Sequence, residues 1–266
     1  MNILYIGIDP SISCTAVTYE FKNKKSTFYT AHNIKKPYRG NSLYYIFENN
    51  DVSDLLKRFQ EKYPISFNTE KSETYFKNSF LRFNIISQGI VNEIVNIIEK
   101  CKPDKVVLSY EDYSYGSSGG LVFDIAEFNM LLKEKLIMKI KIPIEFNLVS
   151  PKEIKKFATG NGNSDKYLMF KAFKEIEDDY VKEIIDIFNP SDLVEDIILK
   201  GTVLKPEVLC KNGTVKKKAV IQKKDKVKTY EVKEKGKKMV IGKSPFSDII
   251  DSYFIMKFGK EIEKWI

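Results

Sequence analysis

Four acidic residues that lie far apart in the sequence have the types and surroundings of a metal site. Asp9 and Glu111 each end a short apolar run, and Asp248 and Asp251 are three residues apart in the last apolar segment. Hydrolysis of a phosphodiester by two Mg²⁺ ions roughly 3.5 to 4 Å apart needs several hard oxygen ligands that converge from rigid elements. We therefore predict that these four residues are catalytic and bind two Mg²⁺ ions, for which Mn²⁺ would substitute.

Each acid alone also has an ordinary explanation. Asp9 precedes Pro10, a common exit turn from a strand, and Asp248 could simply favour the beginning of a helix. The prediction of a site depends on the combination, because two strand ends and one helix face carry all four acids.

The rest of the composition excludes other chemistries. His32 is the only histidine of the 266 residues, which excludes Ser-His-Asp triads, HExxH zinc sites and histidine-centred nucleases. Cys14, Cys101 and Cys210 form neither a CxxC pair nor an even disulfide set, so we interpret them as reduced and structural. Hydrolysis would therefore depend on carboxylates and metal.

Charge is concentrated in one segment of the chain. The net charge is +8, and residues 200–240 contain fourteen lysines against four acids, so the remaining residues have a small net negative charge. A basic segment of this kind suggests a polyanionic partner.

The sequence has no run of about 18 apolar residues and no signal peptide. We expect a cytoplasmic protein with no membrane partner, in the host bacterial cytoplasm if a bacteriophage encodes it.

Apolar periodicity predicts the elements that must position the acids. Short apolar or alternating runs predict five strands, and apolar residues at helical spacing predict three helices. The predicted strands are residues 2–9, 10–21, 24–34, 105–112 and 142–149, and the predicted helices are residues 80–101, 123–140 and 246–266. The fold class is therefore α/β, with a mixed five-stranded sheet flanked by helices. In such sheets, sites form beyond the carboxyl ends of the strands, where Asp9 and Glu111 lie.

Two segments are interpreted as insertions into a single domain that covers residues 1–266. Residues 37–79 are polar and irregular, apart from a possible helix around residues 52–63. Residues 180–243 contain a lysine-rich β insertion before the C-terminal helix, with Asn212-Gly213 as a hairpin turn.

The chain contains four separated motifs, GIDPSISCTAV, YEDYSYG, PKEIKKFATGNGNSDK and SDIIDSYF. Together they resemble the motifs of the RuvC family of Holliday-junction resolvases, particularly its bacteriophage members. GIDPSISCTAV is similar to the opening motif, with Asp9 as its acid and Ser11 in place of a glycine, and YEDYSYG is similar to the second, with Glu111 as the family glutamate. PKEIKKFATGNGNSDK matches the third in type and spacing at Pro151, Lys155, Gly160, Gly162 and Lys166. SDIIDSYF resembles the closing Asp-x-x-Asp helix, with Ile249, Ile250 and Ser252 in place of alanines.

The resemblance implies an RNase H-like fold and a Mg²⁺-dependent endonuclease that resolves branched DNA by paired cuts leaving 5′-phosphates. It also implies a homodimer, and we expect residues 123–140 to form part of the interface, because their apolar content exceeds what one buried face requires. Burial under the insertions would explain that excess as well. A role in DNA recombination and repair follows from the same resemblance.

Further residues are predicted to contact DNA. Lys155 and Lys166 are suited to neutralise a phosphate, and Lys166 is also predicted to be catalytic. Lys156 could contribute instead. All three could also be ordinary lysines on the solvated face of a helix. In the family, an aromatic residue of the loop after Glu111 inserts at the junction, and Tyr113 or Tyr115 could take that place or pack beneath the loop. Lysines of the basic segment would bind the DNA backbone or protect edge strands, namely Lys216, Lys217, Lys218, Lys223 and Lys224.

Two rival functions remain open at the level of sequence. A nuclease of the same fold could act on a flap, a packaging terminus, structured RNA or an RNA–DNA hybrid. A catalytically inert nucleic-acid-binding module could retain the fold, although the intact set of acids argues against it.

Overall fold

The computed structural model describes residues 1–30, 40–47, 51–112, 121–188 and 244–263. It gives the backbone alone for residue 47, residues 51–53, residue 121 and four short strands between residues 203 and 221.

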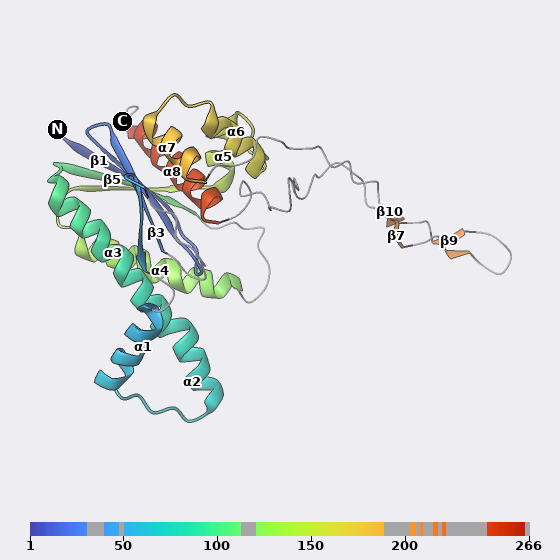
Figure 1. Ribbon diagram of the computed structural model, residues 1–266. Helices are drawn as coiled ribbons and strands as arrows, with labels where there is room; N and C mark the ends of the chain where they lie inside the picture. The colour runs from blue at the N-terminus through green and yellow to red at the C-terminus, as the bar shows by residue number, and fades with distance from the viewer. Residues whose placement is uncertain are drawn as a thin grey trace.

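A mixed six-stranded sheet forms the centre of the molecule (Figure 1). Its strands are β1 (Ile3–Asp9), β2 (Ala16–Phe21), β3 (Lys24–Thr30), β4 (Leu43–Phe47), β5 (Lys105–Glu111) and β6 (Ile144–Val149), in the order β4-β3-β2-β1-β5-β6. The first three strands are an antiparallel meander, and β5 and β6 continue the sheet in parallel with β1. The predicted α/β class, with a mixed sheet flanked by helices, is confirmed.

The sheet has one strand more than the five predicted. β4 lies within the segment that we interpreted as irregular and pairs in parallel with β3. Its five residues, LYYIF, are flanked by polar sequence, so the apolar signal is too short to stand out. Leu43 and Tyr45 are nevertheless buried, which places β4 in the core rather than outside it.

Helices cover both faces of the sheet (Figure 1). They are α1 (Asp51–Lys62), α2 (Glu70–Phe76), α3 (Arg82–Cys101), α4 (Leu121–Lys139), α5 (Pro151–Thr159), α6 (Lys166–Lys174), α7 (Asp179–Phe188) and α8 (Phe246–Glu263). A π-helical turn, η1 (Lys77–Leu81), joins α2 to α3, so the helix predicted at residues 80–101 is the second part of a longer one. α3 and α4 cover one face, whereas α5 to α8 cover the other (Figure 1).

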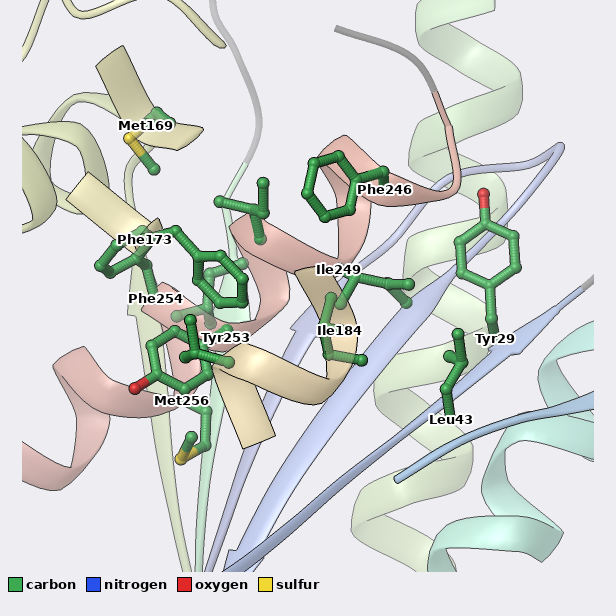
Figure 2. Packing of buried hydrophobic residues seen from close by; sticks show 14 of the residues in the cluster. Tyr29, Leu43, Met169, Phe173, Ile184, Phe246, Ile249, Tyr253, Phe254 and Met256 are labelled. Atoms are coloured by element: carbon green, nitrogen blue, oxygen red, sulfur yellow. The ribbon is translucent and has the colours of Figure 1, made fainter. Parts of the chain in front are cut away.

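The pleat of the strands divides the core between these two layers. On β1, Leu4, Ile6 and Ile8 face the cluster formed with α3 and α4. The opposite face holds the cluster formed with α5 to α8, which is rich in aromatic rings (Figure 2). Gly7 belongs to this second face, where a Cβ atom would lie 2.3 Å from backbone atoms of Met256 and Ser252. Glycine at position 7 therefore allows α8 to contact the backbone of β1.

α8 lies between the sheet and the helices outside it and is buried on nearly all sides. Ile249 and Ile250, two of the three residues that replace family alanines, are fully buried in the aromatic-rich cluster. The third, Ser252, forms a 2.7 Å hydrogen bond with Thr18 of β2. The larger residues are thus accommodated by core packing and by one buried polar pair.

Part of the second predicted insertion also belongs to the folded domain. α7 occupies residues 179–188, and four of its side chains are buried against α8 and the sheet, namely Tyr180, Val181, Ile184 and Phe188. Further along, β7 (Val203–Lys205) pairs with β10 (Val220–Ile221), and β8 (Val208–Leu209) pairs with β9 (Val215–Lys217). This agrees with the predicted β character, while the Asn212-Gly213 turn lies outside the described residues. No helix in the described ranges is long and apolar enough to cross a membrane.

Candidate active site

The four predicted acids are contributed by three elements that meet at one end of the sheet. Asp9 is the last residue of β1, and Glu111 is the last residue of β5, the parallel neighbour of β1. Asp248 and Asp251 lie near the beginning of α8, which packs across β1, β2 and β5. Rigid strands and a fully packed helix thus hold the acids within electrostatic range of one another.

Asp9 and Glu111 share a hydrogen bond between their carboxyl groups. Burial raises the pKa of Asp9 well above its usual value, and the negative charges of Glu111, Asp251 and Asp248 raise it further. Burial also raises the pKa of Glu111, although the hydrogen bond from Asp9 and two nearby lysines oppose that rise. Without a cation, Asp9 therefore tends to keep a proton that it donates to Glu111.

Asp251 lies between opposing charges. Burial raises its pKa to about 7, with the charges of Glu111 and Asp248 adding to the rise and those of Lys166 and Lys155 opposing it. The same two lysines also lower the pKa of Glu111. Lys155 and Lys166 therefore lie beside the acids, as the sequence predicted, whereas Lys156 is exposed and does not contribute to these shifts.

Asp248 is held by a set of donors around its carboxylate. One oxygen, Oδ2, accepts a hydrogen bond from the Tyr29 hydroxyl at 2.8 Å and a longer one from the Cys14 thiol at 3.3 Å. The other, Oδ1, accepts from the Ser247 hydroxyl at 2.9 Å and lies 4.0 Å from the Lys166 ammonium. Lys166 also donates to Ser247 at 3.0 Å, so lysine, serine and aspartate form a chain.

The four carboxylates are not arranged as a preformed metal-binding site. Among the residues that the structure describes, no three His, Cys, Asp or Glu side chains are grouped so that they could hold an ion as they stand. Asp9 and Glu111 are hydrogen-bonded to each other, and Asp248 accepts from Tyr29, Cys14 and Ser247, so three of the four carboxylates are engaged with protein partners. The donor set still fits Mg²⁺ or Mn²⁺ chemically, since it consists of hard carboxylate oxygens whose mutual repulsion a cation would relieve.

The lysine motif has a local structure that explains its spacing. Ser150 caps α5 through a reciprocal capping box with Glu153, and Pro151 occupies the first turn. α5 ends at Gly160, whose φ of +77° favours glycine. At Gly162 a Cβ atom would lie 3.0 Å from the Lys152 carbonyl oxygen.

The loop after α5 then closes on itself. Thr159 and Ser164 share a 2.6 Å hydrogen bond, and both hydroxyls bond to the carbonyl of Asn161. Asp165 caps α6, so Lys166 begins that helix and its side chain extends to Ser247. The Gly-x-Gly turn thus brings lysines from two helices to the same group of acids.

Ser11 replaces the family glycine without visible strain. Among the described residues, positive φ angles outside glycine occur at Lys22, Asn23 and Lys102 and do not include Ser11. Its carbonyl accepts a hydrogen bond from the Thr15 hydroxyl at 3.1 Å, which closes the turn after Asp9.

Several predicted DNA contacts cannot be placed. Tyr113, Tyr115, Lys218, Lys223 and Lys224 lie outside the described residues, and for Lys216 and Lys217 only the backbone of β9 is described. Their contacts with DNA stay predictions.

Sequence reasoning missed three residues of this site. Tyr29 is fully buried, and in the sequence it is one aromatic of an ordinary strand. The sequence predicts only a structural role for Cys14 and gives Ser247 no role. The available signal for Ser247 was its position next to Asp248, whereas Tyr29 and Asp248 are 219 residues apart and no local pattern links them.

Comparisons with known proteins give no family assignment. No protein-family model matches the chain, and no curated protein matches it. Solved structures do match. RuvC of Thermus thermophilus is 12% identical over 66% of this chain and 80% of its own, with a TM-score of 0.32. T. thermophilus RuvC in complex with Holliday junction substrate is 11% identical over 64% and 77%, with a TM-score of 0.34.

The yeast mitochondrial Holliday junction resolvase Ydc2 is 12% identical over 99% of this chain and 80% of its own, with a TM-score of 0.40. RuvC is the namesake of the family that the sequence motifs resemble. At these identities and TM-scores the likenesses carry no argument about substrate or mechanism, and the function proposed below rests on the residues of this chain.

Proposed function

We propose that this protein is a Mg²⁺-dependent endonuclease that cuts branched DNA. The observation that carries the proposal is the meeting of Asp9, Glu111, Asp248 and Asp251 beside Lys155 and Lys166 at one end of the sheet. An electrostatically unfavourable cluster of four carboxylates, held by three elements of the core, is costly to keep unless it binds cations.

The four carboxylates would hold two Mg²⁺ ions, which would supply charge stabilisation and an activated water for phosphodiester hydrolysis. The protein residues have separable tasks in this scheme. Asp9 and Glu111 would both have to be ionised to act as ligands, so cation binding would favour loss of the proton that burial helps Asp9 to keep. Lys155 and Lys166 neutralise the scissile phosphate and stabilise the negative charge that develops on it.

The preference for four-way junctions, with paired cuts that leave 5′-phosphates, is proposed from the four RuvC-like motifs. The match of PKEIKKFATGNGNSDK is the most specific of them, and each of its two glycines has a structural reason in this chain. The basic segment at residues 200–240 would contact the DNA backbone, because lysines recognise charge rather than base identity.

Paired cutting requires two sites, and we propose a homodimer that uses α4. The inner face of this helix is buried against α3, while Phe123, Met130 and Ile137 recur at intervals of seven residues on its outer face. These three side chains are 74%, 65% and 59% exposed in the single chain. Such a stripe is more apolar than a solvated helix face requires and suits an isologous contact with a second copy.

The primary test is the variant Asp9→Asn, with Asp54→Asn as the control for a carboxylate on an exposed helix position. Asp9→Asn should abolish Mg²⁺-dependent cleavage of a four-way junction, by at least about a hundredfold, while binding to the junction is preserved or strengthened. Asp54→Asn should cleave as the wild type does. Unchanged cleavage by Asp9→Asn would exclude this site.

The substrate is tested separately with labelled junction, flap, linear duplex and RNA–DNA hybrid at equal concentration. Paired symmetric cuts in the junction support a resolvase. Cleavage confined to flap or hybrid would retain the nuclease and reject the junction specificity, and binding without any cleavage would favour an inert module.

A further inference from the structure

Tyr29 occupies a place in this site that the proposed chemistry does not use. It lies on β3, and Figure 2 shows its ring standing up from the strand with the hydroxyl toward the beginning of α8. The side chain is fully buried, and its hydroxyl donates to Asp248 Oδ2 at 2.8 Å. A buried hydroxyl that donates to a carboxylate is a strong, orienting contact.

The ring itself is fixed from the other side. Tyr45 of β4 meets Tyr29 edge-on, with ring centroids 5.8 Å apart and planes at 81°. Because β4 pairs with β3, Tyr45 and Tyr29 are opposed in register. The hydroxyl of Tyr29 therefore has little freedom to leave Asp248.

The two oxygens of Asp248 consequently differ. Oδ2 is anchored to the core by Tyr29 and, at 3.3 Å, by Cys14. Oδ1 faces Ser247 and Lys166, and the Lys166 side chain is 51% exposed, whereas the Asp248 side chain is 11% exposed. Ser247 donates to Oδ1 and accepts from Lys166, so the contacts of this oxygen lead to an exposed lysine rather than into the core.

From this geometry we propose that Tyr29 is a positioning residue, which anchors Asp248 Oδ2 so that Oδ1 is presented to a divalent cation. The inference rests on the proposed function, because it assumes that Asp248 is a metal ligand. It concerns a residue that touches neither cation nor DNA and acts only through Asp248. Loss of such an outer contact typically weakens metal affinity by about 10- to 100-fold.

The test compares Tyr29→Phe with Tyr180→Phe. Both variants keep the ring and remove one buried, hydrogen-bonded hydroxyl, since Tyr180 bonds to Thr27 away from the acids. Both should lose a similar amount of thermal stability. Mn²⁺ binding is measured by electron paramagnetic resonance titration, and cleavage is measured as a function of Mn²⁺ concentration, with KM for DNA and kcat determined separately.

We expect Tyr29→Phe to weaken Mn²⁺ binding by about tenfold or more and to shift the metal dependence of cleavage to the same extent, with KM for DNA unchanged. Tyr180→Phe should retain wild-type Mn²⁺ affinity. Equal Mn²⁺ affinities in the two variants would overturn the inference while leaving the nuclease intact.

A third variant separates action through Asp248 from a general structural effect. In an Asp248→Ala background, Tyr29→Phe should cause no further loss of Mn²⁺ affinity, because the carboxylate through which it would act has been removed. A full additional loss would overturn the inference. Wild-type protein that neither binds Mn²⁺ nor cleaves DNA would refute the proposed function and this inference together.

Discussion

The pKa of Asp251 depends on its burial and on the charges of the acids and lysines around it. Its pKa of about 7 in the folded chain exceeds the value of about 3.9 expected in an unfolded chain. Between these values the folded state binds more protons than the unfolded state. Without a cation, the contribution of Asp251 to the free energy of unfolding therefore falls as the pH rises from about 4 to about 7.

We therefore expect Asp251→Asn to be stabilised relative to the wild type in the metal-free protein, and more so at pH 8 than at pH 5. The gain in unfolding free energy of the variant over the wild type should grow across this range by an amount of order 1 kcal/mol. Urea titrations in EDTA at several pH values measure it, with Asp54→Asn as the control for removing a carboxylate from an exposed helix position. A difference that does not change with pH would contradict the assigned environment of Asp251.

Individual residues of the site were predictable to different extents. Asp9 and Glu111 could be found because each ends an apolar strand, and Asp248 and Asp251 because they share one helix face. Tyr29 could not be found, because it reads as one more apolar residue of a strand. Its role depends on a contact between chain segments 219 residues apart.

At the scale of elements, the close contact between β1 and α8 decides where two of the acids lie. Gly7→Ala would place a Cβ atom 2.3 Å from the backbone of α8, which no side-chain rotation can relieve. We expect a loss of about 3 kcal/mol or more in unfolding free energy. Mg²⁺-dependent cleavage should also be lost, because a displaced α8 would move Asp248 and Asp251 away from Asp9.

Denaturant unfolding of Gly7→Ala measures this effect, and Gly160→Ala provides the control. At Gly160 no atom lies within 4 Å of an added Cβ, so only the positive φ opposes the change. The control should lose about 1 kcal/mol. Equal losses in the two variants would mean that the approach of α8 is not the constraint.

The elements themselves were largely readable from periodicity. The three opening strands, β5, β6, α3, α4 and α8 correspond to apolar runs or helical spacing in the sequence. β4 was missed because five apolar residues in polar surroundings resemble a loop, and its partner β3 is identified only in three dimensions. α7 was placed in an insertion although its apolar residues pack against α8.

At the scale of the whole molecule, the exposed stripe of α4 predicts the oligomeric state. Met130→Glu combined with Ile137→Glu places two charges on this stripe and should convert a dimer to a monomer. Sedimentation or light scattering detects the change. The monomer should still nick a junction but lose the coordination of paired cuts, because only one site engages each junction.

Ile65→Glu is the control, since Ile65 is an exposed apolar residue of the loop between α1 and α2. It should leave the mass in solution and the paired cuts unchanged. A wild-type protein that is monomeric at micromolar concentration would reject the proposed interface, as would a double variant that remains dimeric.

The separation in sequence of the elements that carry the acids has a consequence for biosynthesis. Cys14 and Asp248 touch in the folded protein although they are 234 residues apart, and Asp9 and Asp251 are separated by a similar length of chain. A ribosome therefore completes β1, β5 and their helices before the segment that becomes α8 emerges. During that interval the nascent chain lacks half of its candidate ligands and part of its core. Under the proposed function, nuclease activity would therefore arise only when α8 docks, and chains that terminate before α8 would not cleave DNA.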